Sequence, residues 1–242
     1  MQYGAHLPLI AFESATWTLA DVCGYAQRAA ALEYRFLCAN DHLFFARPWL
    51  DGPTALAATL ERSADMTIAT TVALPVIRGP IQTAKMLAAL DRLSGGRLIA
   101  GVGPGSSQRD YAAVGVAFED RWKRFDEAVR AMRSVLDEHA EPGRPPVWIA
   151  SWGSAAGLRR VTRLGDGWLA SGYNTTPSGF RQSVATLPKG FPNGIATMWM
   201  YVTDKRREAE RMLGEVLAPV LNRPVEALRD LALPIGSAEL CA

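Results

Sequence analysis

The hydrophobic positions of this chain fall into two patterns that alternate along its length. Short apolar segments lack the polar alternation of a half-exposed sheet, which is typical of strands buried on both faces. Longer segments between them carry apolar residues at helical spacing. The predicted strands are Tyr3–Leu9, Tyr34–Ala39, Met66–Leu74, Arg97–Val102, Val147–Ala150, Gly167–Ala170 and Ala196–Val202. The predicted helices are Trp17–Leu32, Pro53–Ser63, Pro80–Leu93, Asp120–His139, Ser154–Leu164 and Asp204–Leu217.

Local signals indicate where several helices begin and which side they bury. Thr16 is the predicted cap of the first helix, because its hydroxyl can accept a bond from a free backbone N–H. The second and third helices begin with prolines, whose fixed φ suits a first helical turn. The long helix carries one apolar stripe that is predicted to be buried: Phe125, Val129, Met132 and Leu136.

The alternation of strands and helices predicts an α/β fold with a parallel sheet. At 242 residues the chain has the length of one α/β barrel or of two small domains. We expect a single domain over residues 1–242, a barrel of the TIM (β/α)8 type. Seven strands are legible, whereas Ser237 has the character of a helix cap and the chain stops at Ala242. We therefore expect a barrel that lacks its last strand at the C-terminus. A doubly wound open sheet is the structural alternative.

The segment Asp91–Gly105 is the most informative part of the chain, and it reads DRLSGGRLIAGVGPG. Gly95 and Gly96 can adopt the left-handed conformation that ends a helix. An apolar strand follows, and Gly103 and Gly105 leave bare backbone amides in the loop beyond it. A flat or anionic ligand could approach these amides closely.

Composition and charge exclude several classes of function. The formal net charge is +2 and no basic block stands out, so a nucleic-acid partner is not expected. Neither a secretory signal nor an apolar run long enough to span a bilayer is found, and no membrane partner is expected. The three cysteines are widely spaced in apolar surroundings, which predicts reduced packing residues of a cytoplasmic protein: Cys23, Cys38 and Cys241.

Five segments in order resemble the luciferase-like monooxygenase family, which comprises flavin- and deazaflavin-dependent TIM-barrel oxidoreductases. They are Asn40–Leu43, Asp91–Gly105, Tyr111–Arg133, Pro146–Ala156 and Leu164–Leu169. The pattern looks most like the branch that uses the deazaflavin coenzyme F-420, although many relatives use FMN. Two features depart from the family: the segment Ala140–Pro145 is short, and the chain ends early relative to the last barrel strand.

The resemblance implies a catalytic or ring-contacting role for His42, which follows the second predicted strand. Imidazole titrates near neutrality, so it can donate or accept a proton while a hydride moves to or from the ring. A histidine hydrogen-bonded within a loop is the alternative. Asp41 either orients His42, bonds the polar edge of the ring or forms a turn.

The resemblance also assigns cofactor contacts to the ends of the third and fourth strands. It implies a non-prolyl cis peptide between Thr71 and Val72, against the face of the ring. After the fourth strand, the residues that could line the ring or its ribityl chain are Gly103, Gly105, Ser106 and Ser107. Sugar-phosphate dehydrogenases of this branch have a catalytic glutamate where this chain has Ser106, so sugar-phosphate oxidation is not expected. A tight turn without ligand contacts is the alternative.

A fourth cofactor contact is predicted where the fifth strand meets the next helix: Ser151, Trp152, Gly153 and Ser154. Free N–H groups at a helix N-terminus bind phosphate readily, and the cofactor phosphate is the candidate ligand. Ser154 could instead serve only as the helix cap. His6, near the end of the first strand, is interpreted as a barrel histidine with its hydrogen bonds satisfied, and a side chain that faces the pocket is the alternative. The three histidines are far apart and no metal-binding spacing occurs, so no metal is expected.

The leading hypothesis is an oxidoreductase that transfers a hydride between coenzyme F-420 and a small organic substrate. An FMN-dependent luciferase-like monooxygenase that uses O₂ is the first alternative. A degenerate, non-catalytic flavin-binding barrel is the alternative from another class. A phosphosugar isomerase or aldolase is disfavoured, because no lysine or glutamate lies suitably at a predicted strand end. The helical exterior of such barrels is compatible with a homodimer.

Overall fold

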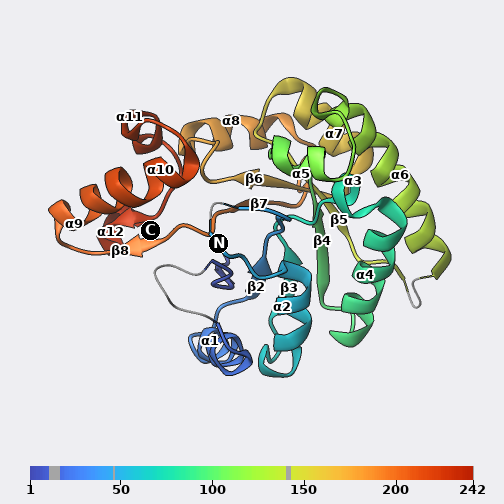
Figure 1. Cartoon of the computed structure of the whole chain (residues 1–242), viewed down its shortest axis with the longest axis horizontal. Coiled ribbons are helices and arrows are strands. Elements are labelled where there is room, and N and C mark those ends of the chain that lie inside the picture. The colour runs from blue at the N-terminus through green and yellow to red at the C-terminus, as the bar shows by residue number, and fades with distance from the viewer. Residues whose placement is uncertain (11–16, 46, 140–142, 242) are drawn as a thin grey trace. The chain divides into compact units, whose positions relative to one another are not determined.

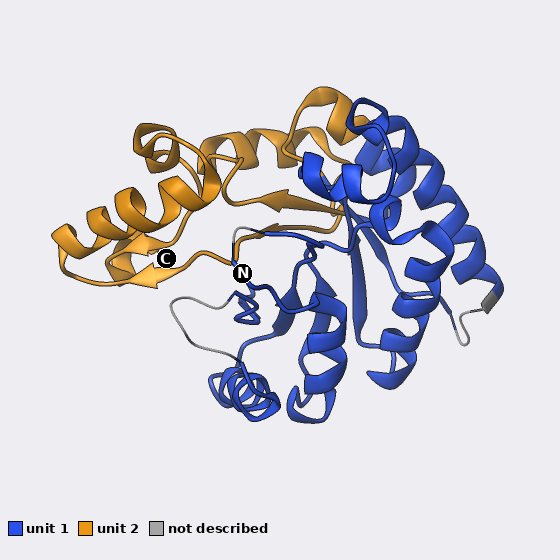
Figure 2. Ribbon diagram, in the orientation of Figure 1, with its two compact units in different colours: residues 1–150, 160–167 blue, residues 151–159, 168–242 orange. Residues whose placement is uncertain are grey.

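The computed structural model describes residues 1–10, 17–45, 47–139 and 143–241, with the side chain of His139 outside the description. Contacts between residues divide the chain into two compact units, drawn in two colours in Figure 2. Unit 1 comprises residues 1–150 and 160–167, and unit 2 comprises residues 151–159 and 168–242.

Unit 1 is built on parallel strands that follow one another in chain order (Figure 1). They are β1 (Gly4–His6), β2 (Phe36–Ala39), β3 (Thr67–Thr70), β4 (Leu98–Val102) and β5 (Val147–Ala150). Leu37 pairs with Ile68 and Ile68 with Leu98, and all three side chains are at most 2% exposed. This apolar row explains why the strands are continuous hydrophobic runs in the sequence.

Helices follow the strands of unit 1 and pack on them. They are α1 (Leu19–Ala31), α2 (Gly52–Thr59), α3 (Pro75–Arg78), α4 (Pro80–Leu93), α5 (Gln108–Ala113) and α6 (Arg121–His139), with short 3₁₀ turns at Leu60–Arg62 and Phe118–Asp120. The predicted stripe of α6 is confirmed, since Phe125, Val129, Met132 and Leu136 are fully buried. Helix α7 (Ala155–Leu164) begins in unit 2 and ends in unit 1.

The helix ends follow from local chemistry. The predicted cap Thr16 lies outside the described residues, and the observed cap of α1 is Thr18. Its side chain accepts a bond from the Asp21 N–H while Asp21 bonds the Thr18 N–H in return, which forms a capping box. Gly95 and Gly96 follow α4 with φ of 72° and 78°, the left-handed conformation expected of them.

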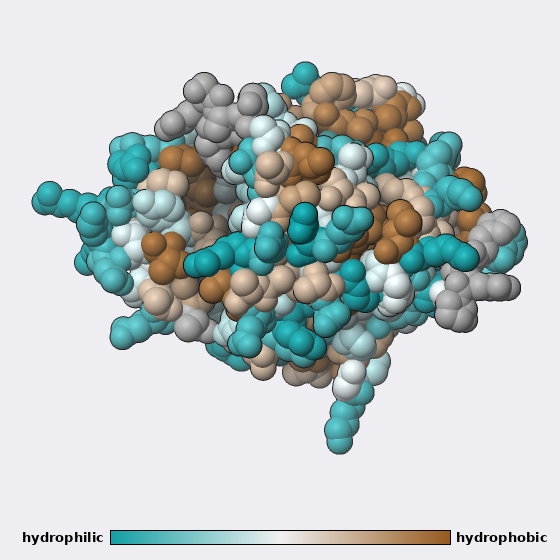
Figure 3. Space-filling view, turned by 90° about the horizontal axis from the view of Figure 1, so that it is seen from below, coloured by the Kyte–Doolittle hydropathy of each residue, from teal (hydrophilic) through white to brown (hydrophobic). Residues whose placement is uncertain are grey.

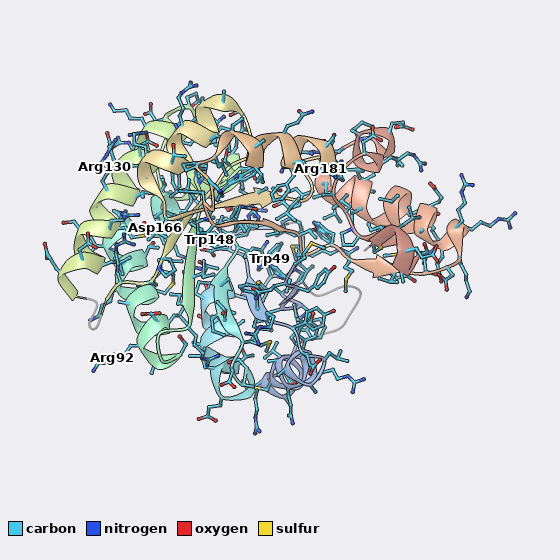
Figure 4. All side chains as sticks on the ribbon, turned by 180° about the vertical axis from the view of Figure 1, so that it is seen from behind. Trp49, Arg92, Arg130, Trp148, Asp166 and Arg181 are labelled. Carbon is cyan, nitrogen blue, oxygen red and sulfur yellow. The ribbon has the colours of Figure 1, made fainter. Side chains whose placement is uncertain are left out.

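Asp166 lies in the turn between α7 and the next strand and binds residues of α6 and of the segment that leads into β5 (Figure 4). Its carboxylate pairs with Arg133 and with Arg144, the latter at 2.6 Å, and accepts a bond of 2.8 Å from the Val147 N–H. Burial would raise the pKa of this carboxyl, but the bonds from Arg144 and Val147 outweigh it and lower the pKa.

Strand β6 (Gly167–Ser171) belongs to unit 2 from Trp168 onward and pairs in parallel with β7 (Asn193–Ala196). Helix α8 (Pro177–Thr186) connects the two strands. A separate parallel pair follows, β8 (Tyr201–Val202) with β9 (Ile235–Gly236). The remaining helical segments are α9 (Arg206–Arg211), a π-helical stretch at Met212–Leu217, α10 (Ala218–Leu221), α11 (Val225–Arg229) and α12 (Ala238–Cys241).

The predicted seventh strand, Ala196–Val202, is wrong. The barrel strand β7 ends at Ala196, and Thr197 then forms a turn in which its hydroxyl accepts a bond of 3.1 Å from the Trp199 N–H. The chain resumes an extended form only at β8. Ser237 is confirmed as a cap, since its hydroxyl accepts a bond of 3.4 Å from the Leu240 N–H at α12.

Hydrophobic and hydrophilic residues are interspersed on the face shown in Figure 3. In the described parts of the chain, no helix combines the length and the apolarity needed to cross a membrane. Cys23, Cys38 and Cys241 are all free thiols.

Candidate active site

The residues that leave β2, β3 and β4 are joined by backbone hydrogen bonds beyond the ends of the strands. Thr71 donates its N–H to the Ala39 carbonyl at 2.7 Å, and Gly103 donates to the Ala73 carbonyl at 3.0 Å. The predicted residues His42, Thr71, Val72 and Gly103 therefore lie at the carboxyl ends of neighbouring strands. This is the end at which TIM barrels place their catalytic residues.

His42 is held by Asp110, a residue of α5 that the sequence analysis did not select. Its Nδ1 atom lies 3.3 Å from Oδ2 of Asp110. The other carboxylate oxygen accepts a bond of 3.1 Å from the Phe44 N–H, so one acidic side chain fastens two residues of the same loop. Asp110 is 1% exposed, whereas the His42 side chain is 18% exposed.

The pKa of Asp110 lies below its ordinary value. Burial alone would raise this pKa, but hydrogen bonding and charge from His42, followed by the bonds from Phe44 and Ser107, lower it by more. Asp110 is consequently an ionised carboxylate at neutral pH, and it can only accept hydrogen bonds.

Aromatic rings surround the imidazole. The ring centroids of His42 and Trp49 are 4.9 Å apart in an edge-on arrangement, and those of Phe45 and Trp49 are 4.6 Å apart. Trp49, labelled in Figure 4, is held in place because its neighbour Leu50 donates its N–H to Leu9. The indole Nε1–H of Trp49 is buried and has no partner among the described residues, so a donor is available to a ligand here.

Asp41 forms an ion pair with Arg78. The Arg78 guanidinium donates to both of its carboxylate oxygens, at 2.6 and 2.7 Å, and also pairs with Asp51. Asp41 is 4% exposed. The bonds to Asp41 hold the pKa of Arg78 above its ordinary value. Within the structure, the role of Asp41 is to fix the start of the loop that carries His42, and its contact with a cofactor stays a prediction.

The peptide bond between Thr71 and Val72 is cis, as the resemblance implies. The hydroxyl of Thr71 is buried and has no hydrogen-bond partner in the part of the chain that the structure describes. Val72 packs beside Gly103, where an added Cβ would lie 2.7 Å from Cγ2 of Val72 and 3.2 Å from Cβ of Ala150. A glycine at position 103 is therefore required by this close approach.

The loop after β4 is fixed by its own contacts. Gly105 has a φ of 81°, and the Tyr111 hydroxyl donates a bond of 2.5 Å to the Pro104 carbonyl. The Ser107 hydroxyl caps α5 by accepting a bond of 3.1 Å from the Asp110 N–H, whereas Ser106 is exposed. Of the two serines, Ser106 thus has the side chain that is open to solvent.

The predicted phosphate-binding segment belongs to unit 2. Ser154 caps α7, since its hydroxyl accepts a bond of 3.1 Å from the Gly157 N–H, and the Ser151 hydroxyl accepts one of 3.3 Å from the Gly153 N–H. Ser151 is 7% exposed and Trp152 is 59% exposed. The capping role is thus confirmed, and phosphate binding stays a prediction.

Two of the anchoring residues, Asp110 and Arg78, were missed by the sequence analysis. Ser107 and Asp110 have the spacing of a helix cap and its third residue, which is a usable signal for the short helix α5. No comparable signal marks Arg78, because its partners Asp41 and Asp51 are distant in sequence. Among the described residues, no group of histidine, cysteine and acidic side chains could hold a metal ion.

Residues 9–229 match the family model of the luciferase-like monooxygenases. The chain is 28% identical over 180 residues to an F-420-dependent glucose-6-phosphate dehydrogenase of Amycolatopsis mediterranei, covering 62% of this chain and 53% of that protein. An F-420-dependent secondary alcohol dehydrogenase, solved with an F-420–acetone adduct, aligns with a TM-score of 0.77 at 16% identity, covering 99% and 87%. The oxygenating constituent of the Pseudomonas putida 3,6-diketocamphane monooxygenase, solved with FMN, aligns with a TM-score of 0.71 at 14% identity, covering 100% and 86%.

The chain therefore belongs to the luciferase-like monooxygenase family, and its fold is that family's TIM-barrel fold. The expected resemblance and fold class are confirmed. Membership in this family supports an oxidoreductase or monooxygenase that uses F-420 or FMN.

Proposed function

We propose that the protein transfers a hydride between coenzyme F-420 and a small organic substrate, with His42 as the residue that moves the accompanying proton. The observation that carries this proposal is the His42–Asp110 pair in the loop that leaves β2, where Thr71 of the neighbouring strand end donates its N–H to the Ala39 carbonyl. The named relatives support the choice of cofactor, because the dehydrogenase of A. mediterranei uses F-420.

The residues at this end of unit 1 fit a planar ring with polar edges. Thr71 and Trp49 each have a buried polar atom that no other described residue bonds, and a ligand with hydrogen-bonding groups would satisfy them. Gly103 has no side chain to obstruct the approach of a ring to Val72. We assign Thr71, Val72, Gly103, Gly105, Ser106 and Ser107 to this ring. Asp41 supports the loop, and Ser151, Trp152, Gly153 and Ser154 are assigned to the cofactor phosphate.

When bound, the deazaflavin supplies a carbon that accepts or releases a hydride. The protein contributes binding, orientation and a proton. His42 holds or accepts that proton at the ring nitrogen that does not face Asp110. Trp49 and Phe45 cover the imidazole and exclude water from one side. Ser106 stands where sugar-phosphate dehydrogenases of this branch have an acid, so we propose a substrate other than a sugar phosphate.

An FMN-dependent monooxygenase that uses O₂ is the second candidate, because the P. putida enzyme with the same fold binds FMN. Cofactor titration separates the two. We expect the purified protein to change the fluorescence of coenzyme F-420 on binding and to leave FMN unchanged at equal concentration. FMN binding alone would replace the first candidate with the second.

Turnover tests catalysis directly. Reduced F-420 is mixed with small ketones and aldehydes, and oxidised F-420 with the matching alcohols, while the visible absorbance of the cofactor is followed. We expect His42→Gln to lower kcat about a hundredfold or more, in line with the usual contribution of a general acid or base. Binding of neither cofactor would contradict both candidates, and binding without any turnover would support a non-catalytic barrel. A cytoplasmic location and a homodimer stay predictions.

A further inference from the structure

We propose that Asp110 is the positioning residue of His42: it fixes the proton of the neutral ring on Nδ1 and leaves Nε2 as the nitrogen that exchanges protons with substrate. This inference rests on the proposed function for its catalytic consequence. Its structural part, the tautomer of His42, holds or fails independently of any cofactor.

The contacts of the carboxylate determine the direction of the hydrogen bond. Asp110 accepts at Oδ1 from the Phe44 N–H, 3.1 Å away, and its Oδ2 faces Nδ1 of His42 at 3.3 Å. An ionised carboxylate has no proton to donate. Nδ1 must therefore carry the hydrogen, and in the neutral imidazole Nε2 is then the unprotonated acceptor.

The carboxylate is itself held in place from three sides. Asp110 lies in the first turn of α5, where its backbone N–H donates to the cap Ser107. The following residue, Tyr111, is 1% exposed and lies in an apolar cluster with Leu74 and Ile77. The Phe44 N–H then fixes one carboxylate oxygen, which leaves the other for His42. A side chain held this firmly can hold the imidazole in a single orientation.

The chemical consequence is that the two nitrogens of the His42 imidazole have different roles: Nδ1 bonds Asp110, and Nε2 exchanges a proton with the substrate. The proton on Nδ1 stays between His42 and Asp110 throughout the reaction. Nε2 takes a proton from a substrate hydroxyl as the O–H bond breaks, and it returns that proton when the reaction runs backward. The carboxylate stabilises the cationic ring in between without becoming protonated itself.

Asp110→Asn tests this role because it keeps the size of the side chain and changes its hydrogen-bonding character. The amide has one acceptor oxygen for two donors. If that oxygen keeps the Phe44 N–H, the amide NH₂ faces Nδ1 and moves the ring proton to Nε2. We expect kcat to fall about a hundredfold or more, with the Kd for F-420 and the KM changed less than about threefold. Asp110→Glu is expected to recover part of kcat.

Asp126→Asn is the matched control. Asp126 pairs with Arg160 and Arg163 and contacts none of the site residues named above, so its variant loses an equivalent ion-paired carboxylate. We expect it to retain full kcat. Equal losses of kcat in Asp110→Asn and Asp126→Asn would overturn the proposal, as would a wild-type kcat in Asp110→Asn.

The tautomer can be read without cofactor by nitrogen NMR of protein labelled in its three histidines, with His42→Gln identifying the resonance. The expected neutral ring of the wild type is protonated at Nδ1, and that of Asp110→Asn at Nε2. A wild-type ring protonated at Nε2, or the same tautomer in both proteins, would overturn the proposal. If this NMR result holds while neither F-420 nor FMN binds, the proposed function fails and the positioning role stands.

Discussion

The Val72 side chain lies so close to Gly103 that residue 103 has no room for a Cβ atom. Because the Cβ of an alanine at position 103 would lie 2.7 Å from Cγ2 of Val72, any side chain here displaces Val72. The cost of overpacking at position 103 is small compared with the stability of a domain. The displaced residue, however, belongs to the surface that is proposed to face the cofactor.

We predict that Gly103→Ala weakens F-420 binding about tenfold and lowers stability by about 1–3 kcal/mol, the usual cost of overpacking. Gly24→Ala is the matched control, since an added Cβ at Gly24, within α1, meets nothing within 4 Å. Fluorescence titration and denaturant unfolding of both variants check this. Wild-type affinity in Gly103→Ala would show that Val72 is not part of the binding surface.

His6 offers a second prediction on the residue scale. Its pKa is lowered from 6.5 to about 4, because burial disfavours the charged ring by more than the bond between Nδ1 and the Leu7 carbonyl favours it. Nε2 is buried and has no partner in residues 1–10, 17–45, 47–139 and 143–241, so the expectation of a fully satisfied barrel histidine is wrong for that atom. Its neighbour on β2, Cys38, stays neutral because burial raises the pKa of its thiol to about 12.

A lowered histidine pKa means that the unfolded chain binds the proton first as the pH falls. Stability contributed by the neutral ring is therefore complete above pH 6.5 and is lost progressively toward pH 4. Between pH 7 and about pH 5 we predict a loss of about 2 kcal/mol that is absent from His6→Gln. Urea unfolding at both pH values measures it, and equal losses in the two proteins would count against a buried neutral His6.

On the scale of elements, ion pairs and charged hydrogen bonds fix the positions of loops and strand ends that apolar packing alone does not determine. Arg78 of α3 fixes Asp41, Asp110 of α5 fixes His42, and Asp166 joins α6 to the start of β5. In each case a partly or fully buried carboxylate accepts from more than one donor, so removal of the acid leaves unpaired donors behind.

Asp166→Asn is predicted to cost about 1–3 kcal/mol of stability, because Arg133, Arg144 and the Val147 N–H then share fewer acceptors. Since Asp166 contacts none of the residues around His42, F-420 binding at low temperature should be unchanged. Thermal unfolding together with a cofactor titration tests both parts. A loss of affinity without a loss of stability would show that Asp166 acts on the site.

Element prediction from sequence succeeded where one pattern dominated. The helix Pro80–Leu93 and the strand Val147–Ala150 were predicted with the observed bounds, because a proline start, a Gly-Gly end and an apolar run mark them. The short helices α3, α5, α8 and α11 were missed, since none carries a long periodic stripe. The strand at Ala196–Val202 failed because a side-chain turn at Thr197 interrupts an otherwise apolar run.

On the scale of the whole molecule, the family fold was predictable, but the partners of the catalytic candidates were not. His42, the cis bond at Thr71 and the role of Gly103 as a residue without a side chain followed from local motifs and resemblance. Asp110 lies 68 residues from His42, and Arg78 lies 37 residues from Asp41. Such pairs arise only when the ends of successive strands come together, which no local pattern records.

A cofactor that binds only the folded chain must stabilise it by mass action. At a concentration of F-420 one hundred times its Kd, the free energy of unfolding is predicted to rise by about 2.7 kcal/mol. His42→Gln should keep this gain, because the proposed role of His42 is proton transfer and not affinity. Calorimetry with and without F-420 measures it, and a gain with FMN in place of F-420 would favour the monooxygenase.

The loop after β2 is held at two places, by Arg78 at Asp41 and by Asp110 at His42 and the Phe44 N–H, which limits where its sequence can vary. Asp41, His42 and the Phe44 backbone are each tied down, yet the side chain of Leu43 between them is 41% exposed. Substitution of Leu43 changes an exposed side chain next to His42 in the sequence and removes none of these hydrogen bonds. The loop can therefore vary at Leu43 while the contacts that hold Asp41, His42 and the Phe44 backbone are kept.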